Sequence, residues 1–180
     1  MKSTLSNRAT NCAKTTLIAA SLLAAGTAFS QAQNPAPRSE RNMSLELANQ
    51  LANQLASATV AACSSGGYNV SAAVVDRADQ LRGLQRADNA GPHTIASAQA
   101  KAYTSASAKN TTLLMMEAAQ KNPAAANVAL IPGFLLLGGG VPVKVGNDVI
   151  GAIGVGGAPG GHLDEQCAVA ALEKAKEWLK

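Results

Sequence analysis

Hydrophobic residues recur at helical spacing in the chain after residue 42. Leucines and alanines at positions 47, 51, 55, 58 and 62 fall on one side of a helix with 3.6 residues per turn. The spacing predicts an amphipathic helix over residues 43–64. Gly66-Gly67 ends it, because glycine marks the C-terminal boundary of many helices.

Short apolar segments further along the chain predict strands. Residues 68–76 and 81–86 flank a turn rich in Asp and Gln, which predicts an antiparallel hairpin. Residues 135–142 and 149–157 predict a second hairpin of two apolar strands, whose glycines permit close backbone approach or tight bends. These glycines fit neither a dinucleotide fingerprint nor a Walker loop, since His162 stands where the phosphate-binding lysine would be.

Three further helices are predicted. Pro92 suits a first helical position, and the helix that follows runs to about Lys109 with many alanines and serines, which indicates close packing against a neighbour. A short helix capped by Thr111-Thr112 runs through Gln120, before Asn122-Pro123, and a last one covers residues 163–179. The order of elements predicts an α+β fold, an antiparallel sheet with packed helices.

The N-terminus has the pattern of a secretory signal peptide. Lys2, Arg8 and Lys14 precede the apolar run 17–25, and Ser30-Gln31-Ala32 offers small residues at a cleavage site. The run is shorter than the roughly 20 residues of a spanning helix, which argues against a membrane anchor. We expect residues 1–32 to be removed on export to the periplasm or the medium, residues 33–42 to form a disordered leader, and residues 43–180 to form one domain.

Removal of the signal peptide changes the charge of the protein. Three of the 15 basic residues and none of the 11 acidic residues lie in it, so 12 basic and 11 acidic residues remain, a net charge of +1. A nearly neutral domain without a basic cluster lacks the electrostatic footprint of a nucleic-acid binder. Its few aromatic residues offer little for stacking on bases; they are Tyr68, Tyr103, Phe134 and Trp178.

Two cysteines remain after the signal peptide, Cys63 and Cys167. In an exported protein an even number permits a disulfide, and closing a loop of about 100 residues would stabilise the fold by roughly 4 kcal/mol. Two buried thiols that act as small hydrophobic side chains are the alternative. The sequence favours the disulfide slightly.

Several ordered segments together resemble one family. They are Val74-Val75-Asp76, Arg86-x-Asp88, Ala90-Gly91-Pro92-His93-Thr94, Ala98-x-x-Lys101-Ala102-Tyr103-Thr104, Gly139-Gly140-Val141-Pro142, Ile150-Gly151-Ala152-Ile153-Gly154-Val155 and Asp164-Glu165-x-Cys167. Their order and separations resemble the GlcG/HbpS-like haem-binding family over nearly the whole chain from residue 43. The resemblance implies a profilin-like α+β fold, a homo-oligomer, and haem or a related tetrapyrrole as ligand.

Haem binding requires an axial ligand, an apolar slot and groups that hold the propionates. His93 lies in the matching segment at a helix start, near Arg86, and is the first candidate for the iron; ordering of the helix start is the alternative role. Arg86, Thr94 and Lys101 are the accompanying cofactor-binding candidates. Lys101, about two helical turns after His93, would meet a propionate unless it is simply solvated.

The remaining candidates carry weaker signals. His162 is expected to face solvent, Met115 and Met116 to pack in the core, and Tyr103 to serve as a substitute ligand. No nucleophile elbow or catalytic dyad stands out, so any activity would come from bound haem. The sequence therefore predicts a protein that sequesters or presents haem; the alternatives are a haem-degrading or peroxidase-like enzyme and a partner of a sensor or transporter.

Overall fold

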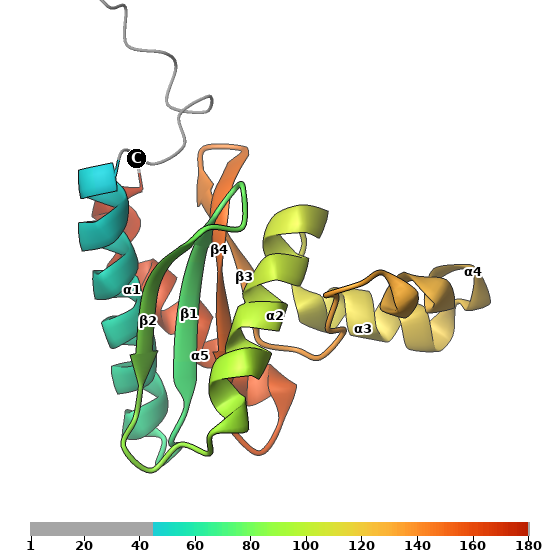
Figure 1. Cartoon of the computed structure of the whole chain (residues 1–180), viewed down its shortest axis with the longest axis horizontal. Helices are drawn as coiled ribbons and strands as arrows, with labels where there is room; N and C mark the ends of the chain where they lie inside the picture. The colour runs from blue at the N-terminus through green and yellow to red at the C-terminus, as the bar shows by residue number, and fades with distance from the viewer. Residues whose placement is uncertain (1–44, 180) are drawn as a thin grey trace, which may run out of the picture. The chain divides into compact units, whose positions relative to one another are not determined.

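The centre of the fold is a four-stranded antiparallel sheet. A computed structural model describes residues 45–179 of the chain, so the predicted signal peptide and the predicted leader lie outside the described residues. The strands are β1 (Ser71–Asp76), β2 (Leu81–Arg86), β3 (Gly140–Val145) and β4 (Asp148–Gly156), in the spatial order β2-β1-β4-β3 (Figure 1). Both predicted hairpins are therefore present, joined through the central pair of β1 and β4.

Helices cover both faces of the sheet (Figure 1). On one face, α1 (Leu45–Ser65) and α5 (Gly161–Lys174) pack with Ala72 and Val74 of β1 into the larger core cluster. On the other face, α2 (His93–Ala108) packs with Val75 of β1 into a smaller one. Because successive strand residues point to opposite faces, the two central strands are buried on both sides. This arrangement confirms the predicted α+β class.

Close packing of α2 on the sheet depends on small residues from both elements. A Cβ on Gly154 of β4 would lie only 1.9 Å from the carbonyl oxygen of Ala98, so a side chain there would force the helix away. The α2 residues on this side are Ala98, Ala102 and Ala106, all buried. The close backbone approach that the sequence predicted for the glycine-rich strands is thus confirmed, and it occurs between strand and helix.

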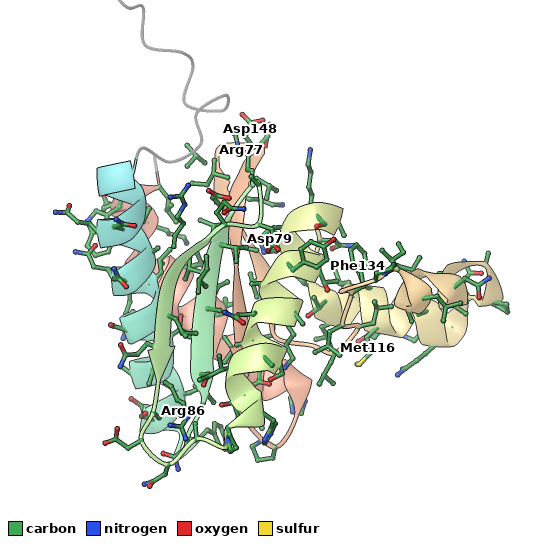
Figure 2. All side chains as sticks on the ribbon, in the orientation of Figure 1. Arg77, Asp79, Arg86, Met116, Phe134 and Asp148 are labelled. Carbon is green, nitrogen blue, oxygen red and sulfur yellow. A yellow bond between two sulfur atoms is a disulfide. The ribbon has the colours of Figure 1, made fainter. Side chains whose placement is uncertain are left out.

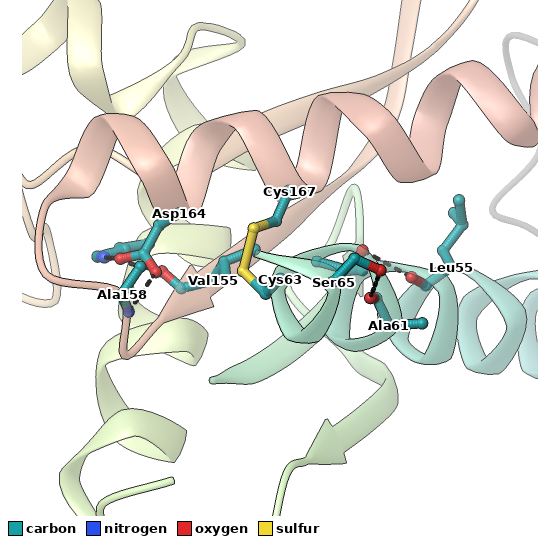
Figure 3. Close-up of a disulfide and its surroundings, with 10 residues drawn as sticks. Leu55, Ala61, Cys63, Ser65, Val155, Ala158, Asp164 and Cys167 are labelled. Atoms are coloured by element: carbon teal, nitrogen blue, oxygen red, sulfur yellow. Dashed lines mark hydrogen bonds and ion pairs between the residues drawn. A yellow bond between two sulfur atoms is a disulfide. The ribbon is translucent and has the colours of Figure 1, made fainter. Parts of the chain in front are cut away.

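A disulfide joins the two helices of the opposite face. Cys63 near the end of α1 and Cys167 in α5 have Cα atoms 5.2 Å apart and are bonded through their sulfur atoms (Figure 3). Both side chains are buried in the larger core cluster. The bridge closes a loop between residues separated by 104 positions.

The segment between α2 and β3 extends away from the sheet and differs most from the prediction (Figure 1). It contains α3 (Thr112–Lys121), the short helix α4 (Pro123–Ala126) and the 3-10 helix η1 (Asn127–Leu130). The sequence predicted α3, with its cap at Thr111, but neither of the short helices. Among residues 45–179, no helix combines the length and apolar character needed to cross a membrane.

Several predicted boundaries are wrong. The first strand begins at Ser71 rather than at residue 68, because the N–H of Tyr68 donates to the carbonyl of Cys63 at the end of α1. Residues 135–139 are not part of the strand, because the backbone N–H of Leu135 donates to Thr104 Oγ1 and the carbonyl of Leu137 accepts from Thr112 Oγ1. Threonine side chains thus replace strand partners there. The last helix ends at Lys174 rather than at residue 179, and a 3-10 turn, η2 (Lys176–Trp178), follows it.

Candidate functional site

The start of α2 presents an exposed imidazole. The side chain of His93 folds over Gly91, where a Cβ would lie 2.7 Å from the ring atom Cε1, so glycine leaves the room the ring occupies. Pro92 precedes the helix without a side-chain cap, and the first turn holds no acidic residue. The N–H of Thr94 donates to the carbonyl of Gly91 at 3.1 Å, but the helix dipole still makes this end of α2 attractive to an anion.

Arg86 lies at the same end of the sheet. Figure 2 shows it at the end of β2, beside the loop that leads to α2. Its Nη2 donates to the carbonyl oxygen of Ala90 in that loop. The residue is exposed, and a guanidinium has five N–H donors, so others remain for a ligand. The structure thus places Arg86 and His93 on two ends of one short loop.

Thr94 does not present its hydroxyl to this surface. Its side chain is 1% exposed, and Oγ1 donates to the carbonyl of Gly91 at 2.6 Å. Because the hydroxyl has one proton, it then accepts from Ser71 Oγ at 2.7 Å. Thr94 therefore fixes the start of α2 against β1, and its contact with a cofactor stays a prediction.

Lys101 is buried rather than solvated. Its side chain is 1% exposed, and Nζ donates to Asp164 Oδ2 at 2.8 Å and to the carbonyl of Val155 at 2.7 Å. Burial raises the pKa of Asp164, while the hydrogen bond and charge of Lys101 act in the opposite direction. Asp164 Oδ1 also accepts the N–H of Ala158 (Figure 3). The solvated alternative is therefore wrong, because the ammonium group is buried and joins α2 to α5; the contact with a propionate stays a prediction.

A pocket of about 500 Å³ lies beside the middle of α2. We call it the hairpin pocket, because the β1–β2 hairpin forms one side and the loop before β3 the other. Its lining residues are Val75, Asp79, Leu81, Gln99, Ala100, Tyr103, Pro132 and Gly133. No histidine lines it; Ala100 is seven residues beyond His93, about 10 Å along the helix.

Tyr103 and Asp79 supply the ionisable groups of the hairpin pocket. The ring of Tyr103 meets that of Phe134 edge to face, with centroids 5.7 Å apart. Asp79 stands in the β1–β2 turn with φ +58° (Figure 2). The Asp and Gln content of the sequence predicted this turn, and the structure places Asp79 in the lining of the pocket.

The other candidates are dispersed. Met115 and Met116 are half-buried on α3 and belong to neither core cluster, so their predicted role in the core is wrong. His162 is exposed, as expected, although it lies in the first turn of α5 rather than in a loop. Within residues 45–179, no three His, Cys, Asp or Glu side chains gather closely enough to hold a metal ion.

The chain is similar to proteins of a known family. Residues 47–173 match the family model described as "Haem degrading protein HbpS-like". The chain belongs to the HbpS-like family. A crystal structure of Streptomyces reticuli HbpS, a double mutant, is 40% identical with a TM-score of 0.64 over 69% of this chain and 84% of that chain. No protein with curated function matches.

Two solved structures of lower sequence identity have the same fold. The Klebsiella pneumoniae protein ORFY is 29% identical, with a TM-score of 0.65 over 69% of this chain and 86% of that chain. A structure described as a PduOC:haem complex is 22% identical, with a TM-score of 0.59 over 67% of this chain and 88% of that chain. At this identity the second shows shared architecture alone. The α+β fold expected of an HbpS-like protein is confirmed.

Proposed function

We propose that this protein binds haem at the start of α2, with His93 as the axial ligand of the iron. Membership of a family described as haem degrading supports the ligand, and the exposed imidazole of His93 is the observation that supports the site. Histidine is a common axial ligand of haem iron. His93 is the first residue of α2, so its backbone is part of a helix rather than of a loop.

The surroundings of His93 suit the acidic edge of haem. The uncapped first turn of α2 offers backbone N–H groups and the positive end of the helix dipole, and Arg86 adds a guanidinium. Propionates are carboxylates, and both features attract them. Bound haem would supply iron able to react with oxygen or peroxide, while the protein would supply the ligand and the orientation.

Tyr103 is the alternative axial ligand. It lines the hairpin pocket, whose volume of about 500 Å³ and apolar wall would receive part of a macrocycle. A tyrosinate can ligate haem iron. The acid Asp79 in the same pocket opposes propionates, however, and this favours His93 over Tyr103.

The biological role that we propose is to sequester or present haem outside the cytoplasm. The signal-peptide pattern of residues 1–32 supports export; the intact mass of exported protein would reveal removal of this segment. A homo-oligomer is part of the proposal, supported by large hydrophobic side chains exposed in and beside the segment that extends from the sheet. These are Leu114, Leu130, Ile131 and Leu137.

A haemin titration of the full chain, followed by Soret absorbance, tests the proposal. We expect a saturable shift at one haem per chain, and we expect His93→Ala to abolish it or weaken affinity by about tenfold or more. His162→Ala is the matched control, since His162 is also exposed in a first helical turn and folds over a glycine two residues before it. Tyr103→Phe keeps the aromatic ring and tests the alternative ligand.

Each outcome has a distinct meaning. Loss of the Soret shift in His93→Ala alone, with an unchanged thermal melt, supports His93 as the axial ligand. Loss of the Soret shift in Tyr103→Phe alone supports haem binding in the hairpin pocket instead. Absence of a shift in the parent protein overturns haem binding.

Haem degradation is the second candidate function, favoured by the description of the family. Incubation of the complex with ascorbate or hydrogen peroxide, followed at the Soret band, separates the two. A stable band over many minutes supports binding alone. Loss of the band with release of iron, faster than for free haemin, supports degradation.

A further inference from the structure

The hairpin pocket lies apart from the proposed haem site. Its position along α2 sets it about two helical turns beyond His93. Its walls come from the β1–β2 hairpin, from α2 and from the loop before β3. None of its lining residues takes part in the contacts at the start of α2.

The size and walls of the hairpin pocket suit a small organic molecule. Its volume of about 500 Å³ lies within the range of roughly 300–1,000 Å³ typical of small-molecule sites. Val75, Leu81, Ala100 and Pro132 give an apolar wall, and the ring of Tyr103 adds an aromatic face. A ligand with a flat or compact hydrocarbon body would therefore bury apolar surface here.

Asp79 is held rigidly beside this wall. Its backbone has φ +58°, which is uncommon for residues other than glycine, and its N–H donates to the carbonyl of Asp76 at 3.1 Å. The Asp76 carboxylate fixes the rest of the turn, because Oδ1 accepts the N–H groups of Ala78 at 2.8 Å and Gln80 at 3.0 Å. Unusual backbone conformations maintained in this way are frequent at ligand sites.

The charges around Asp79 favour a positively charged ligand. Burial and, after it, the charge of Asp76 raise the pKa of Asp79. The guanidinium of Arg82 donates two hydrogen bonds to Asp76 Oδ2, from Nε at 2.8 Å and from Nη2 at 2.7 Å. The Asp79 carboxylate would therefore gain from an added cation, whereas a carboxylate ligand would be repelled.

We propose that the hairpin pocket binds a small organic amine, with the ammonium group on the Asp79 carboxylate and the apolar body against Leu81, Ala100 and Tyr103. The aromatic face of Tyr103 also attracts a cation, and the Gln99 amide offers a further hydrogen bond. The amine is bound and not transformed, because none of the lining residues is a nucleophile paired with a base.

The test uses three probes that share a body and differ in charge: 2-phenylethylamine, 2-phenylethanol and 3-phenylpropionate. Titration of the full chain, followed by amide chemical shifts in two-dimensional NMR, locates the site and measures affinity. We expect the amine to shift resonances of Leu81, Gln99 and Ala100 with a dissociation constant at or below about 1 mM. We expect the alcohol to bind at least about fivefold more weakly and the acid not to bind.

Two variants and one control test the role of the pocket. Asp79→Asn removes the charge and retains the backbone, because asparagine adopts positive φ as readily as aspartate does. We expect it to weaken amine binding by about fivefold or more. Ala100→Leu fills the pocket and is expected to abolish the shifts there. Asp148→Asn removes an exposed charge at the same end of the sheet, outside the pocket, and is expected to leave binding unchanged.

Three results would overturn the proposal. One is the absence of shifts at the pocket with about 10 mM amine. The second is equal affinity of the parent protein and Asp79→Asn. The third is an equal loss of amine affinity in Asp79→Asn and Asp148→Asn, which would indicate a general effect of net charge.

Discussion

Replacement of Lys101 by methionine will strongly destabilise the fold. The side chains of Lys101 and Asp164 are 1% and 3% exposed, and the Lys101 ammonium donates to both the Asp164 carboxylate and the Val155 carbonyl. Lys101→Met preserves most of the side-chain volume but leaves a buried carboxylate without its cation. Breaking one side of a buried ion pair costs about 3–5 kcal/mol. For a domain of this size, the melting temperature should fall by roughly 10–20 °C.

The stability lost in Lys101→Met will depend on pH, in a direction set by the pKa of Asp164. Without Lys101, burial is opposed less, by the hydrogen bond from Ala158, and raises the pKa of Asp164 further than in the parent protein. A carboxyl whose folded-state pKa is raised makes the folded state relatively more stable as pH falls, since it takes up a proton there more readily than in the unfolded chain. The difference in unfolding free energy should therefore be largest near pH 7 and shrink toward about pH 4.

Urea unfolding followed by far-ultraviolet circular dichroism, at several pH values, measures this difference. Lys144→Met is the matched control, because Lys144 is exposed on β3 and its replacement should change stability by no more than about 0.5 kcal/mol. The double variant Lys101→Met/Asp164→Asn removes both charges and should recover part of the lost stability. A loss below about 1 kcal/mol, or one that is the same at all pH values, would refute the reasoning.

Two further predictions concern stability. Replacement of both Cys63 and Cys167 by alanine should lower the free energy of unfolding by about 2–5 kcal/mol in the absence of reductant, and dithiothreitol should have little effect on that variant; an unchanged urea midpoint would contradict a stabilising disulfide. Burial acts to raise the pKa of Asp76, but hydrogen bonds to its carboxylate, including those from Arg82, outweigh it and lower the pKa. This stability is present above the unfolded pKa of about 4 and is lost as pH falls below it, so Asp76→Asn should destabilise the fold at pH 7 and much less near pH 2. The exposed Asp88→Asn serves as control in the same urea titrations, and an equal effect of both variants would count against the role of the turn.

Local patterns in the sequence were sufficient for most of the elements. Helical spacing of leucines and alanines placed α1, and Thr111 marked the start of α3 through the cap that the structure contains. The strand predicted from residue 135 was wrong because leucines next to glycines resemble a strand whether or not a partner is present. In the structure, Thr104 and Thr112 take the backbone hydrogen bonds of that segment, and both come from other parts of the chain.

The residues of the candidate site were likewise predicted only in part. His93 and Arg86 could be selected from the sequence, because their shared loop and the helix start are local features. The burial of Lys101 was not predicted, since a lone lysine on a helix is usually solvated. No residue near it in the chain indicates its partner Asp164, which is 63 positions away. Asp79 had no candidate role until the fold placed its turn beside α2.

The sequence by itself determined the fold class, the order of helices and strands, and the family to which the chain belongs. These depend on periodicity, caps and ordered motifs, which are properties of neighbouring residues. The tertiary structure alone decided that Cys63 reaches Cys167, that Lys101 is buried on Asp164, and that Asp79 faces an apolar pocket. Each of these joins residues far apart in the chain, and their free energies come from burial and distance, which exist only once the helices have packed on the sheet.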